Sequence, residues 1–329
     1  MKHLLTGLLL LAAISSFAGS VPDELYGDWS LNIESGEAGW LRMADNNGEL
    51  EVSMMVNVGS IRPLRSVEVK DGKIHVPLKT YREKGKEGAI LSTNRAEIWS
   101  ENGKLTGMIF THFPQEDRHV EDPFTGIAIP PMPPAPDLSK IKWGQPINLF
   151  NGKDLTGWEV RRPEKINGWS AQDGCLVNTT PKTDFSATGA YANLMTVPKF
   201  ADFKLHIEFN IGKDRNSGIY VRGLYEAQVV DRDSRMQGLQ GVGSIFGLVE
   251  RTENPAYEGG KWQTYEITLV DRHMTVVLNG VTTIDNQPVS GPTPGAVKTN
   301  PMAPGPIYLQ GDHTSVKYRN IVLTPRISE

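Results

Sequence analysis

Four polar side chains of different chemistry lie close together near the end of the sequence. The segment 305–320 reads GPIYLQGDHTSVKYRN and contains Gln310, Asp312, His313 and Arg319. A short turn between two strands needs no such combination, whereas a site that binds and transforms a polar molecule can use all four groups. Imidazole is the side chain best suited to proton transfer near neutral pH. This turn is therefore the first candidate for a functional site.

Several stretches in the second half of the chain alternate between apolar and polar residues, which is typical of strands with one buried face. The predicted outward side chains are Glu208, Tyr220, Arg222, Glu226, Gln228, Trp262, Glu266 and Gln310. Aromatic faces can stack on sugar rings, and carboxylates, amides and guanidiniums hydrogen-bond hydroxyl groups. A carbohydrate-binding surface therefore competes with an ordinary solvated face, which most antiparallel sheets carry.

The elements that must position these residues are strands, so the predicted fold class is all-β. Residues 21–119 hold short alternating runs separated by Asn-Gly and Asp-Gly turns, which predicts a small antiparallel β-barrel or sandwich. Its opening Gly27-Asp28-Trp29 resembles the start of a lipocalin-like barrel. Residues 120–145 contain the run IAIPPMPPAPD and predict a semi-rigid linker. Residues 146–329 predict a jelly-roll β-sandwich.

The first 20 residues have the composition of a secretory signal peptide. A basic start precedes an apolar stretch from Leu4 to Ile14 and then small residues. That stretch is too short to span the roughly 30 Å of a bilayer core, and no cysteine follows it to accept a lipid. We therefore expect a periplasmic or secreted bacterial protein without membrane attachment after signal cleavage. Cys175 is the single cysteine, so an internal disulfide is excluded.

Charge and motifs exclude several other classes. A net charge of −4 with both signs mixed argues against a nucleic-acid partner. The histidines show no ligand spacing such as His-x-x-x-His, and no glycine-rich phosphate loop is found, so no cofactor and no metal are expected. A calcium ion held by Asp231 and Asp233 is a secondary expectation. The sequence predicts no particular oligomeric state.

Six groups of residues follow one another in an order typical of a known family. They are 148–158, 216–222, 225–231, 260–266, 278–280 and 305–313 with 318–321. With these residues, the stretch from about Ile147 to Ile327 resembles the 3-keto-disaccharide hydrolase family, also described as 3-keto-glucoside 1,2-lyase and 3-keto-2-hydroxyglucal hydratase. The resemblance implies a concanavalin-like jelly roll and a carbohydrate substrate, a glycoside whose C3 hydroxyl has already been oxidised to a ketone.

The resemblance also implies a reaction. The ketone acidifies the neighbouring C2–H, a base removes this proton, and the C1 substituent leaves by 1,2-elimination. Water then adds to the 3-keto-2-hydroxyglucal, which gives net hydrolysis. Such a site needs a base, donors for the C3 oxyanion and an acid for the leaving oxygen.

The sequence supplies candidates for each role. The predicted catalytic residues are Glu226 and His313 as alternative bases, with Asp231 or Asp312 orienting the imidazole. The predicted substrate-binding residues are Glu208, Tyr220, Arg222, Gln228, Trp262, Gln310 and Asp312. Two alternatives stay open: a carbohydrate-binding module without catalysis, and an N-terminal unit that binds a small apolar ligand or a partner protein.

Overall fold

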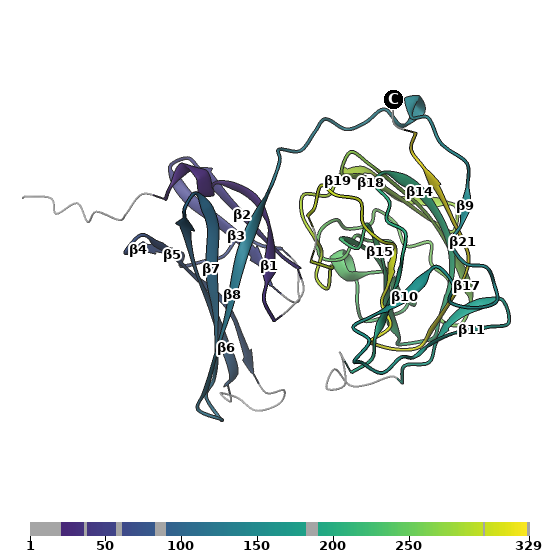
Figure 1. Ribbon diagram of the computed structural model, residues 1–329, viewed down its shortest axis with the longest axis horizontal. Coiled ribbons are helices and arrows are strands. Elements are labelled where there is room, and N and C mark those ends of the chain that lie inside the picture. Colours follow the sequence, from purple (N-terminus) through teal and green to yellow (C-terminus); the bar gives the residue numbers. More distant parts are fainter. Residues whose placement is uncertain are drawn as a thin grey trace, which may run out of the picture.

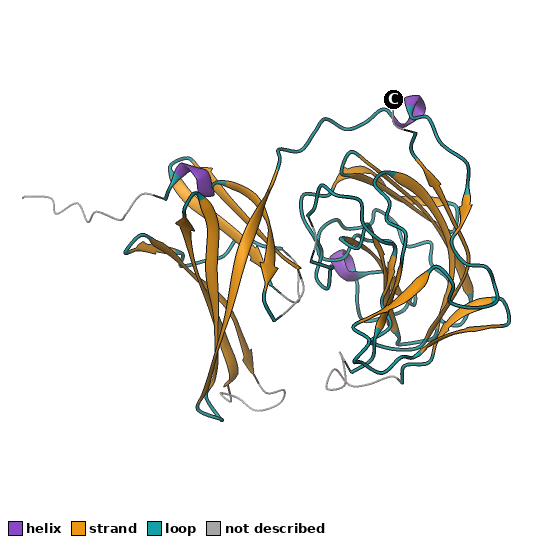
Figure 2. Cartoon of the chain, viewed as in Figure 1, coloured by secondary structure: helices purple, strands orange, loops and turns teal. Residues whose placement is uncertain are grey.

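The computed structural model describes residues 21–35, 38–56, 61–82, 90–181, 190–298 and 300–327. The proposed signal peptide lies outside the described residues. Within these residues, every long element is a strand. The helical elements are short 3-10 helices such as η1 (Asp23–Leu25), η2 (Leu138–Lys140) and η4 (Gly238–Gln240) (Figure 2). No helix in the described part of the chain is long and apolar enough to cross a membrane. The predicted all-β fold class is confirmed.

The first half of the chain forms one curved antiparallel sheet (Figure 1). Its strands are β1 (Gly27–Ile33), β2 (Ala38–Asn46), β3 (Glu49–Met55), β4 (Glu68–Lys70), β5 (Lys73–Arg82), β6 (Ile90–Glu101), β7 (Lys104–Phe113) and β8 (Arg118–Ile129). They lie in the order β3-β2-β1-β8-β7-β6-β5-β4, so the first strand of the unit pairs with the last. We call this unit the N-terminal sheet.

The concave side of the N-terminal sheet holds its own apolar core. Leu31, Ile98, Leu105 and Phe124 are almost completely buried there. Gly107 lies directly under the Phe124 ring, where an added Cβ would come within 2.1 Å of a ring carbon. The sheet can therefore close over its core only because this position lacks a side chain.

Strand β8 runs further than the sequence indicates. It ends at Ile129, so the first ten residues of the predicted 120–145 linker belong to the N-terminal sheet. The reason is that Phe124 and Ile129 are buried against neighbouring strands. The nearby prolines make this strand segment look like part of a linker in the sequence. The chain then continues without strands to β9, and it is tied to the second half by Arg272, whose Nη2 donates to the Pro130 carbonyl at 2.9 Å.

The second half of the chain is a sandwich of two antiparallel sheets (Figure 1). The five-stranded sheet has the order β10 (Trp158–Arg161), β13 (Asn193–Thr196), β20 (Tyr308–Leu309), β15 (Asn216–Val221) and β16 (Tyr225–Val230). The larger sheet has the order β11 (Trp169–Gln172), β12 (Cys175–Asn178), β21 (Val316–Pro325), β14 (Phe203–Ile211), β17 (Trp262–Val270), β18 (His273–Leu278) and β19 (Val281–Pro288), with β9 (Ile147–Asn148) beside β21.

Every second residue of the facing strands fills the space between the two sheets. Leu205 and Phe209 of β14 are buried in the same cluster as Ile219 of β15 and Ala227 and Val229 of β16. Because strand side chains alternate, Tyr220, Glu226 and Gln228 must point to the other side of the five-stranded sheet. This outer side is itself buried, since Glu226 is only 3% exposed.

Candidate functional site

Two rows of side chains cross the outer face of the five-stranded sheet. Strand register places Met195, Tyr308, Tyr220 and Glu226 side by side in the first row. The second row, one pleat away, contains Gln310, Gly218 and Gln228. The rings of Tyr220 and Tyr308 are in contact, with their centroids 4.6 Å apart. We call this surface the polar face.

Glu226 is the buried acid of the polar face. Its Oε2 accepts a hydrogen bond from the Tyr220 hydroxyl at 2.9 Å, and its amide donates to Thr293 Oγ1 at 3.0 Å. Its other oxygen lies above Gly218, where an added Cβ would come within 2.1 Å of Oε1. The carboxyl group therefore occupies the space that a side chain at position 218 would take.

The environment of Glu226 favours its protonated form. Burial raises the pKa of this carboxyl well above its ordinary value, the Tyr220 hydrogen bond lowers it in part, and the charge of Asp312 raises it again. Burial and the neighbouring Glu226 also raise the pKa of Tyr220, so this hydroxyl keeps its proton. A carboxyl that holds a proton in a dry environment can act as a general acid.

Asp312 and His313 form a hydrogen-bonded pair in the turn that follows β20. His313 Nδ1 lies 2.6 Å from Asp312 Oδ1, and both side chains are mostly buried. Burial raises the pKa of Asp312, but the hydrogen bond and charge of His313, together with Lys165, outweigh burial and hold it below its ordinary value. An ionised carboxylate at Nδ1 orients the ring and leaves Nε2 as the nitrogen that can accept a proton.

Buried amides hold this turn in place. Asn193 Oδ1 accepts hydrogen bonds from the amides of Gly311 at 2.6 Å and Asp312 at 3.0 Å, while its Nδ2 donates to the Tyr308 hydroxyl. Asn178 Nδ2 donates to the Gly311 carbonyl at 2.8 Å and also to the carbonyl of Thr314. The turn is thus fixed from two strands, one in each sheet.

Gln310 contributes an unused acceptor to the polar face. Its side chain is 9% exposed, and its Oε1 is buried without a hydrogen-bond partner among the described residues. Its backbone amide donates to the Gly218 carbonyl at 2.9 Å, so the residue lies beside the Glu226 carboxyl. A buried acceptor without a partner costs free energy, and a bound hydroxyl group would satisfy it.

A comparison with models of protein families identifies the family of this sandwich. The model of the 3-keto-alpha-glucoside-1,2-lyase-like domain matches residues 145–324, which is more than half of the chain. The chain belongs to this family. The resemblance expected from the sequence is thereby confirmed, and the polar face lies within the matched domain.

Individual relatives are more distant. A 3-keto-disaccharide hydrolase from Bacteroides thetaiotaomicron is 29% identical over 148 residues, which are 37% of this chain and 51% of the relative. The chain thus spans about half the length of this curated relative. A solved structure from Parabacteroides distasonis has 20% identity and a TM-score of 0.45 over 56% of this chain and 94% of its own. The carbohydrate binding module CBM66 from Bacillus subtilis has 13% identity and a TM-score of 0.32 over 51% and 96%.

Within the lyase-like domain, the structure brings together five of the predicted residues. Tyr220, Glu226, Gln310, Asp312 and His313 lie on or beside the polar face. Asp312 is close enough for its charge to act on Glu226, which links the turn to the buried acid. Asp312, and not Asp231, is the partner of the His313 ring.

Other predicted residues lie in the domain but serve its framework. Gln228 shares the polar face, yet its Nε2 donates to the Gln240 carbonyl and its Oε1 accepts from the Val229 amide. Arg222 lies at the opposite end of β15 from the Asp312 turn, and its Nη2 donates to the carbonyls of Pro301 and Ala303.

Asp231 is a turn residue. Its carboxylate accepts from the amides of Asp214 at 2.8 Å and Asp233 at 3.2 Å. Asp233 itself pairs with Arg232 at 2.9 Å. The two carboxylates expected to hold calcium are therefore engaged by backbone amides and by an arginine.

Glu208 and Trp262 lie on the larger sheet, away from the polar face. Glu208 pairs with Arg319 at 2.7 Å, and the Arg319 guanidinium lies 4.0 Å from the centroid of Trp262. The expectation that they share a surface with Glu226 is wrong, because alternation shows which side of a strand a residue occupies but not which sheet holds that strand.

The structure adds residues that sequence reasoning missed. Asn193, Tyr308 and Gly218 are all part of the polar face or its support. Tyr308 alternates with buried Leu309, so the sequence places it outward together with Gln310, although it is not among the predicted site residues. Asn193 gives no such signal, since its partner Asp312 is 119 residues away along the chain.

The segment 291–298 connects the polar face to the N-terminal sheet. On one side, the Pro294 carbonyl oxygen lies 2.7 Å from the Tyr220 hydroxyl oxygen. On the other side, the Ala296 carbonyl accepts from the Ala38 amide at 3.1 Å, and Lys298 Nζ donates to the Ile33 carbonyl at 2.7 Å. The N-terminal sheet therefore holds a segment that itself holds Tyr220 and Glu226.

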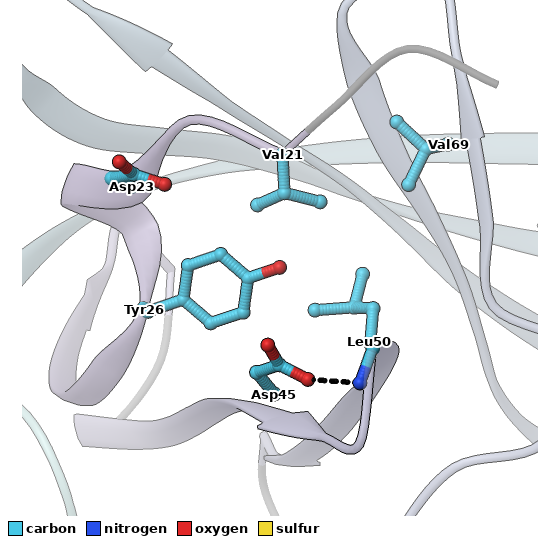
Figure 3. Close-up of a pocket in the computed structure, with 7 residues that line it drawn as sticks. Val21, Asp23, Tyr26, Asp45, Leu50 and Val69 are labelled. Carbon is cyan, nitrogen blue, oxygen red and sulfur yellow. Dashed lines mark hydrogen bonds between the residues drawn. The ribbon is translucent and has the colours of Figure 1, made fainter. Parts of the chain in front are cut away.

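A separate cavity of about 480 Å³ lies at one end of the N-terminal sheet (Figure 3). The side chains of Val21, Tyr26, Leu50 and Val69 surround it together with two aspartates. One of them, Asp45, accepts a hydrogen bond from the Gly48 amide at 2.6 Å and so belongs to its own turn. This mixed lining does not single out an apolar ligand.

Proposed function

We propose that this protein cleaves 3-keto-glycosides by 1,2-elimination of the C1 substituent, followed by hydration of the 3-keto-2-hydroxyglucal. The observation that carries the proposal is the pairing of a buried, proton-holding Glu226 with an ionised Asp312 that orients His313. Family membership supports a glycoside with a C3 ketone as the substrate class.

In the proposed reaction, His313 Nε2 removes the C2 proton. The C2–H electron pair forms the enolate, whose negative charge lies on the C3 oxygen. The enolate then re-forms the C3 carbonyl and expels the C1 substituent, whose oxygen takes the proton of Glu226. Addition of water to C1 of the resulting double bond returns a proton to C2 and completes net hydrolysis.

Asp312 serves this reaction as a positioning residue. Its hydrogen bond to Nδ1 keeps the ring oriented, and its negative charge stabilises the imidazolium that forms after proton abstraction. The Gln310 amide, beside Glu226, is suited to binding a sugar hydroxyl because its buried Oε1 has no partner among the described residues.

A carbohydrate-binding module without catalysis is the alternative. Such a module needs amides and aromatic rings, but it gains nothing from a desolvated carboxyl that keeps its proton. The buried position of Glu226 therefore favours the enzyme. We further propose that the protein is exported, as its first 20 residues predict.

The test is release of the aglycone from a synthetic 3-keto-glucoside by the purified protein, followed by NMR. Glu226→Gln and His313→Ala should each lower turnover by about 10²–10⁴-fold. Glu208→Gln is the matched control, because this carboxylate lies on the larger sheet and pairs with Arg319. Unchanged turnover in both Glu226→Gln and His313→Ala would contradict the proposal. So would a sugar that stays intact with the wild-type protein.

A further inference from the structure

The tip of the β7–β8 hairpin carries a cluster of side chains that the proposed reaction does not use. His112 on β7 and His119 on β8 are directly opposite each other in the strand register. Their rings stack with centroids 4.3 Å apart and planes 3° from parallel. Asp117, in the turn between them, completes a group in which one ligand atom from each residue lies within 4.8 Å of the others.

The backbone fixes this arrangement. Strand β7 ends at Phe113 and β8 begins at Arg118, so both histidines lie next to the turn and point to the same side of the hairpin. Asp117 adopts a positive φ of 47°, which asparagine and aspartate tolerate better than most residues.

The arginine adjacent to His119 in the sequence is directed elsewhere. Arg118 Nε pairs with Glu116 at 2.8 Å, and its guanidinium lies 3.9 Å from the centroid of the Phe113 ring. Since Phe113 and Arg118 pair with each other one residue from the histidines, they occupy the opposite side of the hairpin. No fixed positive charge therefore opposes a cation between His112 and His119 from these two positions.

The donor set selects a class of metal. Two imidazole nitrogens and one carboxylate oxygen suit zinc, nickel and copper ions, whereas calcium and magnesium require sets of oxygen ligands. Zinc binds at about 2.0–2.2 Å from such ligands and in the plane of each imidazole ring, so the two stacked rings must turn out of parallel for the three atoms to meet one ion. Asp117 and His119 are exposed, which leaves them free to make these rotations.

A hollow of about 470 Å³ adjoins the cluster. Both histidines line it, together with Phe110, Glu121 and Arg95. The Arg95 guanidinium lies 3.8 Å from the centroid of the Phe110 ring and pairs with Glu97 at 2.5 Å, so its charge is already matched by a carboxylate. Three protein ligands leave a fourth tetrahedral position, and this position can be filled from the hollow by water or by a small anion.

We propose that His112, Asp117 and His119 form a binding site for a divalent transition-metal ion, with zinc as its expected occupant. The site joins the two strands of the hairpin at their free end. It contradicts the expectation from sequence that the histidines are too scattered to bind a metal. A pair of histidines placed symmetrically about a hairpin turn is the signal that could have revealed it.

The experiment is calorimetric titration of the full chain with zinc sulfate after treatment with a chelator. The wild-type protein should bind one equivalent, and the double change His112→Gln/His119→Gln should abolish this binding. Asp117→Asn should weaken it by about tenfold or more. His75→Ala is the control, because His75 lies outside the cluster and its side chain has an intermediate exposure of 34%.

A spectroscopic readout separates this site from adventitious binding. With cupric ion as the probe, electron paramagnetic resonance should show coupling to two imidazole nitrogens in the wild-type protein and to none at this site in the double variant. Circular dichroism establishes that the variants are folded. Absence of zinc binding by the wild type, or equal binding by the double variant, would overturn the proposal.

Discussion

Tyr220 and Glu226 lie directly opposite each other on β15 and β16, and the tyrosine hydroxyl donates to the buried carboxyl at 2.9 Å. The same hydroxyl contacts the Pro294 carbonyl at 2.7 Å, so one side chain connects the acid to the segment that covers it. The protonation of Glu226 therefore depends on Tyr220 of the adjacent strand, on burial, and on the 291–298 segment, which also contacts the N-terminal sheet.

Replacing Glu226 with glutamine should stabilise the protein at neutral pH. The folded protein keeps the Glu226 proton, whose pKa burial raises, while the unfolded chain releases it above about pH 4.3. Stability from this group is therefore complete below that pH and is lost as pH rises toward the folded pKa. Each pKa unit corresponds to about 1.4 kcal/mol, and each kcal/mol to roughly 2–4 °C in a domain of this size.

Thermal unfolding at pH 4 and pH 8 tests this prediction. The melting temperature of Glu226→Gln minus that of the wild type should be larger at pH 8. A difference that stays constant or shrinks toward pH 8 would show that the carboxyl is ionised in the folded protein.

Removing the Tyr220 hydroxyl should move the pH dependence of turnover. The hydrogen bond lowers the pKa of Glu226, so Tyr220→Phe should raise this pKa further. If Glu226 is the general acid, the alkaline limb of the kcat profile moves to higher pH, and the rate falls by about tenfold from the lost hydrogen bond. Tyr257→Phe is the control, since Tyr257 is exposed. An unmoved alkaline limb in Tyr220→Phe would assign the acid to another group.

Adding a methyl group at Gly218 should displace the Glu226 carboxyl. The new Cβ would meet Glu226 Oε1 at 2.1 Å, so we expect Gly218→Ala to cost about 1–3 kcal/mol of stability and most of the turnover. The control is Gly144→Ala, where the nearest atom is 3.3 Å away.

A second substitution identifies the cause of that loss. Truncation of Glu226 to alanine in the Gly218→Ala background removes the clash, so the two changes should cost less stability together than the sum of their separate effects. Strict additivity of the two unfolding free energies would place the strain elsewhere.

Loosening the N-terminal sheet should lower turnover in the sandwich. Lys298→Met removes the donors to the carbonyls of Ile33 and Glu34. We expect kcat to fall by roughly three- to tenfold, in keeping with one charged hydrogen bond of about 1.5 kcal/mol or less. Lys317→Met, at an exposed position of β21, is the control. A kcat equal to that of the control would mean that the 291–298 segment holds its place unaided.

Alternation in the sequence predicted the sides of strands correctly. Tyr220, Glu226 and Gln310 do share one face, because side-chain direction follows from local backbone geometry. Alternation does not assign strands to sheets, so it groups Glu208 on β14 with Glu226 although the two strands belong to different sheets.

Contacts between distant parts of the chain cannot be predicted from the sequence pattern. Asn193 orients the Asp312 turn, and the 291–298 segment contacts Ala38, yet neither contact has a local signature. The family resemblance predicts Asp231 as a site residue because it stands in a matching segment, whereas its carboxylate accepts hydrogen bonds from backbone amides of neighbouring turns. Such roles depend on which atoms a side chain meets after folding.

The pairing of β1 with β8 has a consequence for how the molecule is made. Asp28 pairs with Ile129, so β1 must wait until about 100 further residues have been made before it finds its partner. Until then, two strand edges of the nascent sheet stay open to solvent or to other chains. A delay in synthesis or transport between these strands would lengthen the period in which aggregation competes with folding.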